Sequence, residues 1–200
     1  VLSLHLALNV TRPYSFQTKS VIRTPKPWDD VMMYTGHQLV VKQPALLDFG
    51  AAGKGHLVDI VGTVLEQHSI TSYTIDGSGD LLHRSSSQSP LRIGLEHPAD
   101  PTQVVGVATL QQGSLCASAT GRRSWKKYHH IIDPVTLLPA QRAVATWVVA
   151  DTTLVADAVA TCLFLEDPQV LSKEFEFEYV LVHQDYTTES SAGFPGEFFR

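Results

Sequence analysis

The chain has 200 residues, enough for one domain, and 44% of them are hydrophobic, which supports a sizeable core and excludes a disordered chain. Its 15 basic and 20 acidic residues give a net charge of −5. A mildly acidic chain without a Lys/Arg stripe is not expected to bind nucleic acid. Two cysteines do not make a disulfide framework, and no apolar run is long enough to predict a transmembrane segment.

Residues 1–10 are apolar, but they lack a basic start and a clear cleavage site. They therefore do not resemble a signal peptide and are better read as a strand or helix segment. Because the sequence does not begin with Met, an N-terminal truncation or a removed leader stays open. A cytoplasmic location and a periplasmic or membrane-associated one are both compatible with this, and the oligomeric state is not indicated.

The first part of the chain alternates between breaks and short apolar runs. Three prolines predict an irregular connection over residues 11–30. Residues 31–34 and 38–41 flank a Thr-Gly-His turn and predict a hairpin. Residues 46–49 look like a short buried strand. Apolar residues then recur at helical spacing, which predicts an amphipathic helix over residues 55–68.

Strands dominate the rest of the sequence. A β-rich run at 71–75 ends in an Asp-Gly turn, and residues 84–90 form a polar loop. Further strands are predicted at 91–95, 104–110, 114–118, 144–150 and 177–183, with a helix at 154–165 and a polar tail at 185–200 that carries three phenylalanines. The run at 144–150 is apolar enough to be central in a sheet. This excess of strands over helices predicts a single α+β domain over residues 1–200.

The segment LDFGAAGKGHLVD, residues 47–59, packs acidic, glycine and basic residues just before the predicted helix. This combination predicts a strand end, a tight loop and a helix N-terminus, whose free backbone N–H groups and positive dipole suit a phosphate. The glycine spacing fits neither the Walker A loop nor the dinucleotide fingerprint. An ordinary strand-to-helix turn with a solvated Lys54 is the alternative.

Two oxygen-bearing side chains, Asp157 and Thr161, lie four residues apart on the second predicted helix. That spacing puts both on one face of the helix. A carboxylate and a hydroxyl are hard ligands suited to Mg²⁺ held partly by a nucleotide phosphate. The alternative is an ordinary helix, in which the threonine bonds back to its own backbone.

A histidine pair, His129 and His130, precedes an Asp133-Pro134 turn. If residues 128–132 are extended, the two rings face opposite sides, so only one can point into a given site. A histidine there is suited to act as a general base near neutral pH. A surface pair beside a turn is the alternative, and a zinc site is a weaker idea because no further ligands lie at structural-zinc spacing.

Taken in chain order, these segments resemble the ApbE family of FAD:protein FMN transferases. The family pattern is a DFGG-like turn, [AG]-K-G, an apolar-Asp step, a GGD-like turn, a Ser-containing strand, H-H-x-x-D-P and A-D-A-x-x-T. The corresponding residues here are 48–50, 53–55, 58–59, 77–80, 117–119, 129–134 and 156–161. The motifs follow one another in the family's order over residues 28–165. Each motif alone is a weak indication of the family, whereas the ordered set is specific.

The resemblance implies a T-fold-like α+β domain, with a mixed or antiparallel sheet and packed helices, that binds FAD and Mg²⁺. Such enzymes move the FMN half of FAD onto a threonine or serine hydroxyl of a target flavoprotein and release AMP. The partner implied is therefore an acceptor flavoprotein. Relative to the family, the N-terminal part of the domain is expected to be reduced or missing.

The family's functional residues can be carried over to matching positions. The implied metal ligands are the Gly53 carbonyl and the side chains of Asp157 and Thr161. The residues implied to line FAD are Gly50, Lys54, His56, Asp80, Ser118 and Ile131. His130 is the implied base for the acceptor hydroxyl, while Asp48 and Asp133 are expected to fix local turns.

The chain departs from the family pattern in three motifs. DFGG-x-A-K-G has become DFGAAGKG, the usual T-S-G is residues 117–119 as Ala-Ser-Ala, and Leu137 stands where a glycine is expected. Two other functions stay open beside transfer. One is a degenerate FAD-binding domain without turnover, and the other is a Mg²⁺-dependent FAD pyrophosphatase that gives AMP and free FMN.

Overall fold

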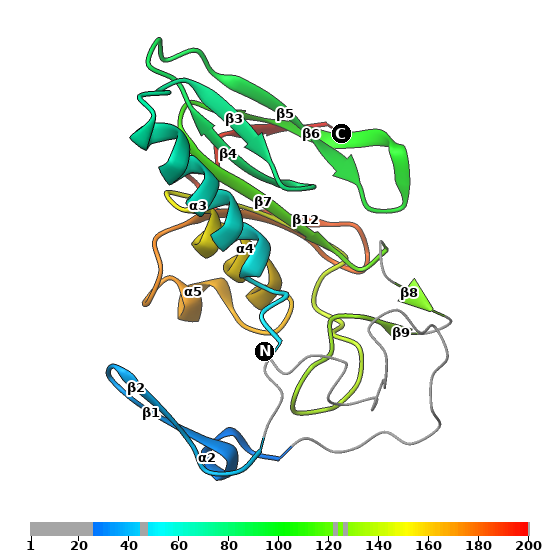
Figure 1. Cartoon of the computed structure of the whole chain (residues 1–200). Helices are drawn as coiled ribbons and strands as arrows, with labels where there is room; N and C mark the ends of the chain where they lie inside the picture. The colour runs from blue at the N-terminus through cyan, green and yellow to red at the C-terminus, as the bar shows by residue number, and fades with distance from the viewer. Residues whose placement is uncertain (1–25, 45–47, 122–123, 126–127, 200) are drawn as a thin grey trace.

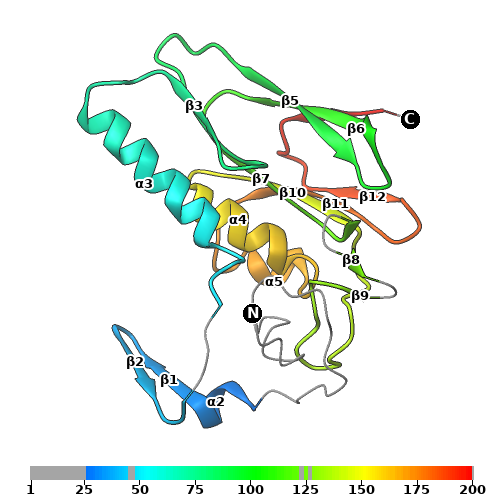
Figure 2. The same cartoon turned by 45° about the vertical axis from the view of Figure 1, so that its right-hand side comes forward.

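A computed structural model describes residues 26–44, 48–121, 124–125 and 128–199 of the chain. Within these residues the fold is α+β, as predicted. Two helices cover one face of a six-stranded sheet, and a smaller three-stranded sheet covers the other face (Figures 1 and 2). The predictions made for residues 1–25 lie outside the described residues.

The six-stranded sheet is antiparallel at every pairing. In spatial order its strands are β12 (Thr188–Ser190), β11 (Glu178–Val182), β10 (Ala145–Ala150), β7 (Gly113–Ala119), β4 (Asp80–Arg84) and β3 (Tyr73–Asp76). The predicted central strand is indeed central, because β10 lies between β11 and β7. Val148 on β10 pairs with Cys116 on one side and with Tyr179 on the other.

Helices α3 (Gly53–Gln67) and α4 (Thr153–Cys162) pack on one face of this sheet. The small side chains of Ala156 and Ala160 let α4 approach Cys116 and Val148 closely, and these four residues belong to one buried cluster. The short helix α5 (Pro168–Leu171) has too few residues for the periodicity of the sequence to predict it.

The smaller sheet consists of β13 (Gly196–Phe198), β6 (Asp100–Leu110) and β5 (Leu91–His97), again antiparallel. Its inner side chains meet those of the large sheet in a second core, where Leu95 joins Trp147 and Phe194. The segment predicted as a polar tail therefore contributes two strands, β12 and β13, and one core phenylalanine.

The predicted hairpin near the start of the described chain is confirmed as β1 (Met32–Thr35) and β2 (Gln38–Val41), preceded by the short helix α2 (Trp28–Val31). It stands apart from both sheets in Figure 1. The remaining pair is formed by β8 (Ser124–Trp125) and β9 (Tyr128–His129).

The strand predicted at residues 46–49 is wrong for its described part. Asp48 and Phe49 lie outside any strand, and Phe49 is 72% exposed. The physical reason is that the Phe49 carbonyl accepts the N–H groups of Ala52 and Gly53, at 3.1 and 2.7 Å, so the chain is already turning into α3. The helix consequently begins two residues earlier than predicted.

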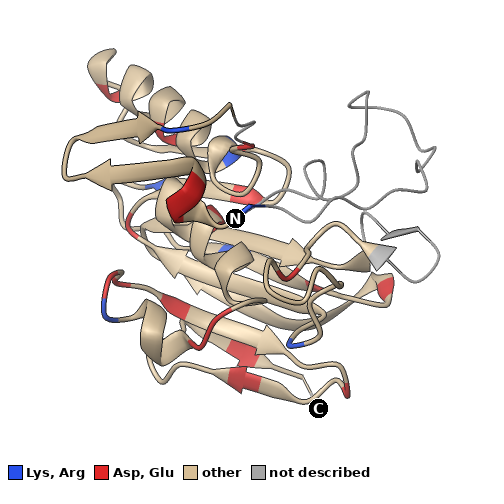
Figure 3. Cartoon of the chain, turned by 90° about the horizontal axis from the view of Figure 1, so that it is seen from below, with Lys and Arg blue, Asp and Glu red and all other residues tan. Residues whose placement is uncertain are grey.

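Charged side chains are spread over the described part of the chain. Figure 3 shows lysines and arginines as isolated positions, with acidic residues between them, rather than as a continuous basic stripe. Among the described helices, none is long and apolar enough to cross a membrane.

Candidate functional site

The glycine-rich segment forms a turn that ends at the first residue of α3. Asp48 fixes this turn as predicted, because its Oδ1 accepts the N–H of Gly50 at 2.7 Å. Gly50 and Gly53 are both near the surface, and the His56 side chain is exposed. The predicted helix start is therefore exposed at Gly53 and His56, but its backbone is not free as predicted, because the Gly53 N–H is accepted by the Phe49 carbonyl.

A buried carboxylate reaches this turn from the neighbouring helix. Asp157, only 4% exposed, accepts the N–H of Gly55 through Oδ2 at 2.9 Å. A side chain at Gly55 would not fit, because a Cβ there would lie 2.2 Å from the Thr153 carbonyl oxygen. Burial raises the pKa of Asp157 above its usual range, and the nearby Asp80 raises it further. The ionised form lacks solvent and is suited to a cation.

Lys54 and Asp80, both predicted to line the site, form an ion pair between the first turn of α3 and the start of β4. Asp80 is fully buried at the start of β4, and its Oδ1 has no hydrogen-bond partner among the described residues. The turn before it requires left-handed backbone, with φ of +67° at Ser78 and +96° at Gly79. A buried oxygen left unpaired in this way is costly.

Thr161 lies one turn beyond Asp157 on α4, and its Oγ1 is 3.3 Å from Oγ of Ser118 on β7. Both side chains are partly buried. The predicted spacing therefore does place the two oxygen-bearing residues of α4 on the side of the helix that contacts α3 and the sheet. Ser118 is brought to the same place from a strand.

The two histidines have different surroundings. The His129 ring is held by the backbone, because Nδ1 accepts the Ile131 N–H at 3.3 Å and Nε2 donates to the Ala140 carbonyl at 3.1 Å. Burial lowers the pKa of His129, which keeps the ring neutral. His130 is half-buried just after β9. His129 is therefore a structural residue, and His130 remains the candidate base.

The residues after the histidines attach this loop to α4. Ile131 is 3% exposed and lies in the same buried cluster as Ala156 and Ala160. Its backbone groups are also engaged, with its carbonyl accepting the Ala140 N–H at 3.0 Å. Asp133 fixes the following turn as predicted, since its Oδ1 accepts the Val135 N–H at 2.7 Å. The structure thus places Ile131 in the core rather than on an open surface.

The sequence did not predict a group of polar residues that link the first turns of α3 and α4. Asp59 accepts the N–H groups of Thr153 and Leu154, both at 2.8 Å. The buried Thr153 also hydrogen-bonds Ser114 on β7, with 2.9 Å between the hydroxyl oxygens. Part of this arrangement could have been predicted, because Thr152 and Thr153 precede an apolar run, which is typical of a helix N-cap.

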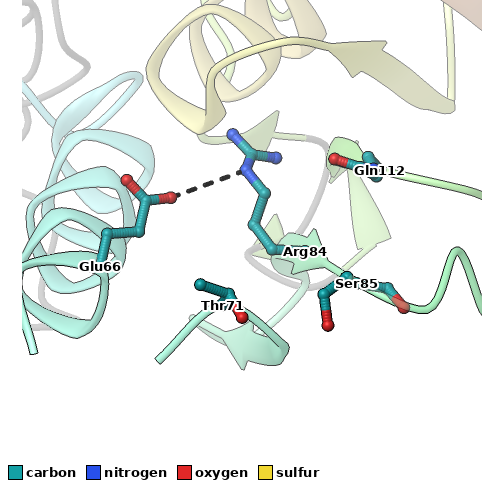
Figure 4. Close-up of a pocket in the computed structure, with 6 residues that line it drawn as sticks. Glu66, Thr71, Arg84, Ser85 and Gln112 are labelled. Atoms are coloured by element: carbon teal, nitrogen blue, oxygen red, sulfur yellow. Dashed lines mark ion pairs between the residues drawn. The ribbon is translucent and has the colours of Figure 1, made fainter. Parts of the chain in front are cut away.

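A separate cavity of about 270 Å³ lies at the other end of α3 (Figure 4). Its lining includes Glu66, Arg84 and Gln112, with Arg84 Nε 3.9 Å from Glu66 Oε1. Glu66 is twelve residues after Lys54, so the cavity is about 18 Å along the helix from the predicted site. None of the predicted site residues lines it.

The donors available for a metal are mixed in kind. Among the described residues, no three His, Cys, Asp or Glu side chains are grouped as a metal site. Asp157 offers a buried carboxylate, Thr161 a hydroxyl and Gly53 a carbonyl at an exposed helix start. Oxygen donors of this type, few in number, suit Mg²⁺ that keeps waters and binds phosphate oxygens as well.

A family model described as "ApbE family" matches residues 9–178. The chain belongs to the ApbE family. The FAD:protein FMN transferase of Treponema pallidum is 30% identical over 167 residues, which cover 74% of this chain and 46% of that protein. A protein of the same description from Klebsiella pneumoniae is 26% identical and covers 76% and 49%. The chain thus spans about half the length of these two curated ApbE relatives.

Solved ApbE structures share this fold. The ApbE protein of Thermotoga maritima superposes with a TM-score of 0.71 at 21% identity, covering 80% of this chain and 57% of that one. The flavin transferase ApbE of Vibrio cholerae gives 0.66 at 24% identity, covering 82% and 57%. At this identity the likeness shows the fold, and the α+β architecture predicted from the ApbE motifs is confirmed.

Proposed function

We propose that this chain transfers the FMN half of FAD to a threonine or serine hydroxyl of a target flavoprotein and releases AMP, with Mg²⁺ bound at Asp157. The ApbE relatives named FAD:protein FMN transferase support the class of reaction. The observation that carries the proposal is the buried Asp157 carboxylate at the first turn of α3, beside the Lys54–Asp80 pair.

The first turn of α3 is suited to hold the pyrophosphate of FAD. The positive dipole end of α3 attracts anions, although the N–H groups of Gly53 and Gly55 are already accepted by the Phe49 carbonyl and by Asp157. Lys54, whose side chain is partly exposed, adds a cation at this turn and pairs with the buried Asp80. Gly50 and His56 flank the same surface and are proposed to contact FAD, and Asp80 and Ser118 to shape the flavin pocket.

The proposed metal ligands are the Gly53 carbonyl, the Asp157 carboxylate and the Thr161 hydroxyl. The Gly55 N–H occupies Asp157 Oδ2 and fixes the carboxylate, so Oδ1 is the oxygen offered to the metal. Bound Mg²⁺ would neutralise charge that develops on the phosphate oxygens. The protein contributes by holding the donors in place before the reaction.

His130 is proposed as the general base. The acceptor hydroxyl oxygen forms a bond to the FMN phosphorus as the bond to the AMP phosphate breaks, and the hydroxyl proton passes to the imidazole. A histidine suits this role because its ordinary pKa lies near neutral pH. His129 is committed to the backbone on both ring nitrogens. Ile131, buried in the core, would act through its position next to His130.

The test is to incubate the purified chain with FAD, Mg²⁺ and an acceptor flavoprotein, and to resolve AMP, free FMN and flavin bound to the acceptor. We expect AMP and acceptor-bound flavin in equal amounts. Loss of product by a factor of 10² or more is expected in Asp157→Ala. Asp185→Ala is the matched control and should keep activity, because Asp185 accepts two hydrogen bonds from Thr187 in the loop between β11 and β12.

The products separate this proposal from the other functions. AMP with free FMN, and no flavin on the acceptor, would mean hydrolysis. Retained FAD without AMP would mean a binding domain. Full activity of Asp157→Ala would rule out the proposed metal role.

A further inference from the structure

Two carboxylates tie the starts of α3 and α4 together from opposite sides. Asp157 on α4 accepts the N–H of Gly55, in the first turn of α3, at 2.9 Å. Asp59 on α3 accepts the N–H groups of Thr153 and Leu154, in the first turn of α4, at 2.8 Å each. Each helix therefore supplies the acceptor for backbone donors that have no partner inside the other helix.

This exchange fixes the start of α4 on several sides. Thr153 is fully buried, its N–H binds Asp59, and its hydroxyl lies 2.9 Å from that of Ser114. Its carbonyl oxygen faces Gly55 so closely that no side chain fits there. The carboxylate of Asp59 also faces the positive end of the α4 dipole, which favours the bond. Small shifts of α4 would break several of these contacts at once.

We propose that Asp59 is a positioning residue for the metal site, an inference that rests on the proposed function. Asp59 is not among the proposed ligands and acts through α4. Its two hydrogen bonds set where α4 begins relative to α3, and Asp157 and Thr161 follow one and two turns later on the same helix. Groups that hydrogen-bond directly to a metal ligand typically change metal affinity by 10- to 100-fold when mutated, and we expect the lower end of this range for Asp59, which acts through the helix.

A second residue caps the same helix without joining the two helices. The Thr152 hydroxyl accepts the N–H of Val155 at 3.3 Å, entirely within the start of α4. Thr152→Ala therefore removes a cap from α4 and leaves the link to α3 in place. It is the matched control for Asp59→Asn, which keeps one acceptor oxygen but cannot accept both N–H groups as the carboxylate does.

The experiment measures the Kd of Mn²⁺ for the full chain in the presence of FAD, from the EPR signal of free Mn²⁺ and corrected for FAD alone. We expect a Kd at least 10-fold weaker in Asp59→Asn and one within twofold of wild type in Thr152→Ala. Both variants are expected to melt at a lower temperature than wild type. Circular dichroism at the assay temperature checks that each is folded, and Asp59→Glu is measured instead if Asp59→Asn is not.

An unchanged Kd in the folded Asp59 variant would overturn the inference. An equal weakening in Thr152→Ala would also overturn it, because any loss of a cap would then suffice. Asp157→Ala tests the proposed metal site independently of Asp59. If it binds Mn²⁺ as wild type does, the proposed metal site itself is wrong, whatever the Asp59 variant shows.

Discussion

The residue with the most unusual environment is Asp157, a carboxylate buried against a helix start. Burial raises its pKa, and the single backbone N–H of Gly55 acts in the opposite direction. Because the pKa of Asp157 is higher in the folded chain than in the unfolded chain, the folded chain binds more protons at pH values between the two. Its stability therefore falls as the pH rises from the ordinary aspartate value through the raised one. A bound cation would reverse this effect.

Replacing this charge should stabilise the metal-free chain. In Asp157→Asn the amide oxygen still accepts the Gly55 N–H, and no charge is buried. Urea unfolding in EDTA should show the variant equal to wild type at pH 4 or below and at least as stable at pH 7. Added Mg²⁺ should stabilise only the wild type. A variant that is less stable than wild type by more than about 1 kcal/mol at pH 7 in EDTA would contradict this account.

Leu137 is the second residue with a testable environment. It adopts a left-handed conformation, with φ of +58°, where the ApbE motif has a glycine. Because a Cβ is strained there, Leu137→Gly should be more stable than Leu137→Ala by about 1 kcal/mol. At the neighbouring Leu138, whose φ is not positive, alanine should be the more stable choice. Thermal unfolding of the glycine and alanine variants at both positions measures these stabilities. If glycine were the more stable, or the less stable, replacement at both positions, the left-handed conformation of Leu137 would be contradicted.

At the scale of elements, the site depends on how closely α3 and α4 approach. Gly55→Ala would put a Cβ 2.2 Å from the Thr153 carbonyl oxygen, so the helices must separate. We expect a loss of about 2–3 kcal/mol in the free energy of unfolding. Gly53→Ala is the control, because the nearest atom to its Cβ would be 3.9 Å away. In the first turn of a helix that change should be neutral or stabilise by up to about 1 kcal/mol. Similar losses in both variants would contradict the close approach.

The helices and most strands could be predicted because their residues alternate or recur along the chain. The run at 144–150 and the Asp-Gly turn after residue 75 carry their own signal, and both were placed correctly. Short elements have too few residues for periodicity: α5 starts at its own Asp167 cap and Pro168, and β13 forms because it pairs with the distant β6. The role of Asp59 was hidden for the same reason, since its partners lie 94 and 95 residues away.

At the scale of the whole molecule, the end of the chain is part of the fold. Phe194 is 8% exposed in the core between the two sheets, and β13 pairs with β6 beside it. Phe194→Ala should therefore cost about 3–4 kcal/mol in the free energy of unfolding. Phe199→Ala, at a position that is 57% exposed, should cost less than about 0.5 kcal/mol. Chemical denaturation measures the free energy of unfolding of both variants. If Phe194→Ala cost as little as Phe199→Ala, Phe194 would not be packed between the two sheets as described.

We propose that the junction of α3 and α4 holds a metal against the pyrophosphate of FAD. The most direct measurement is the ³¹P NMR relaxation of FAD bound to the chain when Mn²⁺ replaces Mg²⁺. We expect strong broadening of both phosphorus signals with wild type, and line widths close to those with Mg²⁺ for Asp157→Asn. Equal broadening with the two proteins would contradict a metal site at Asp157.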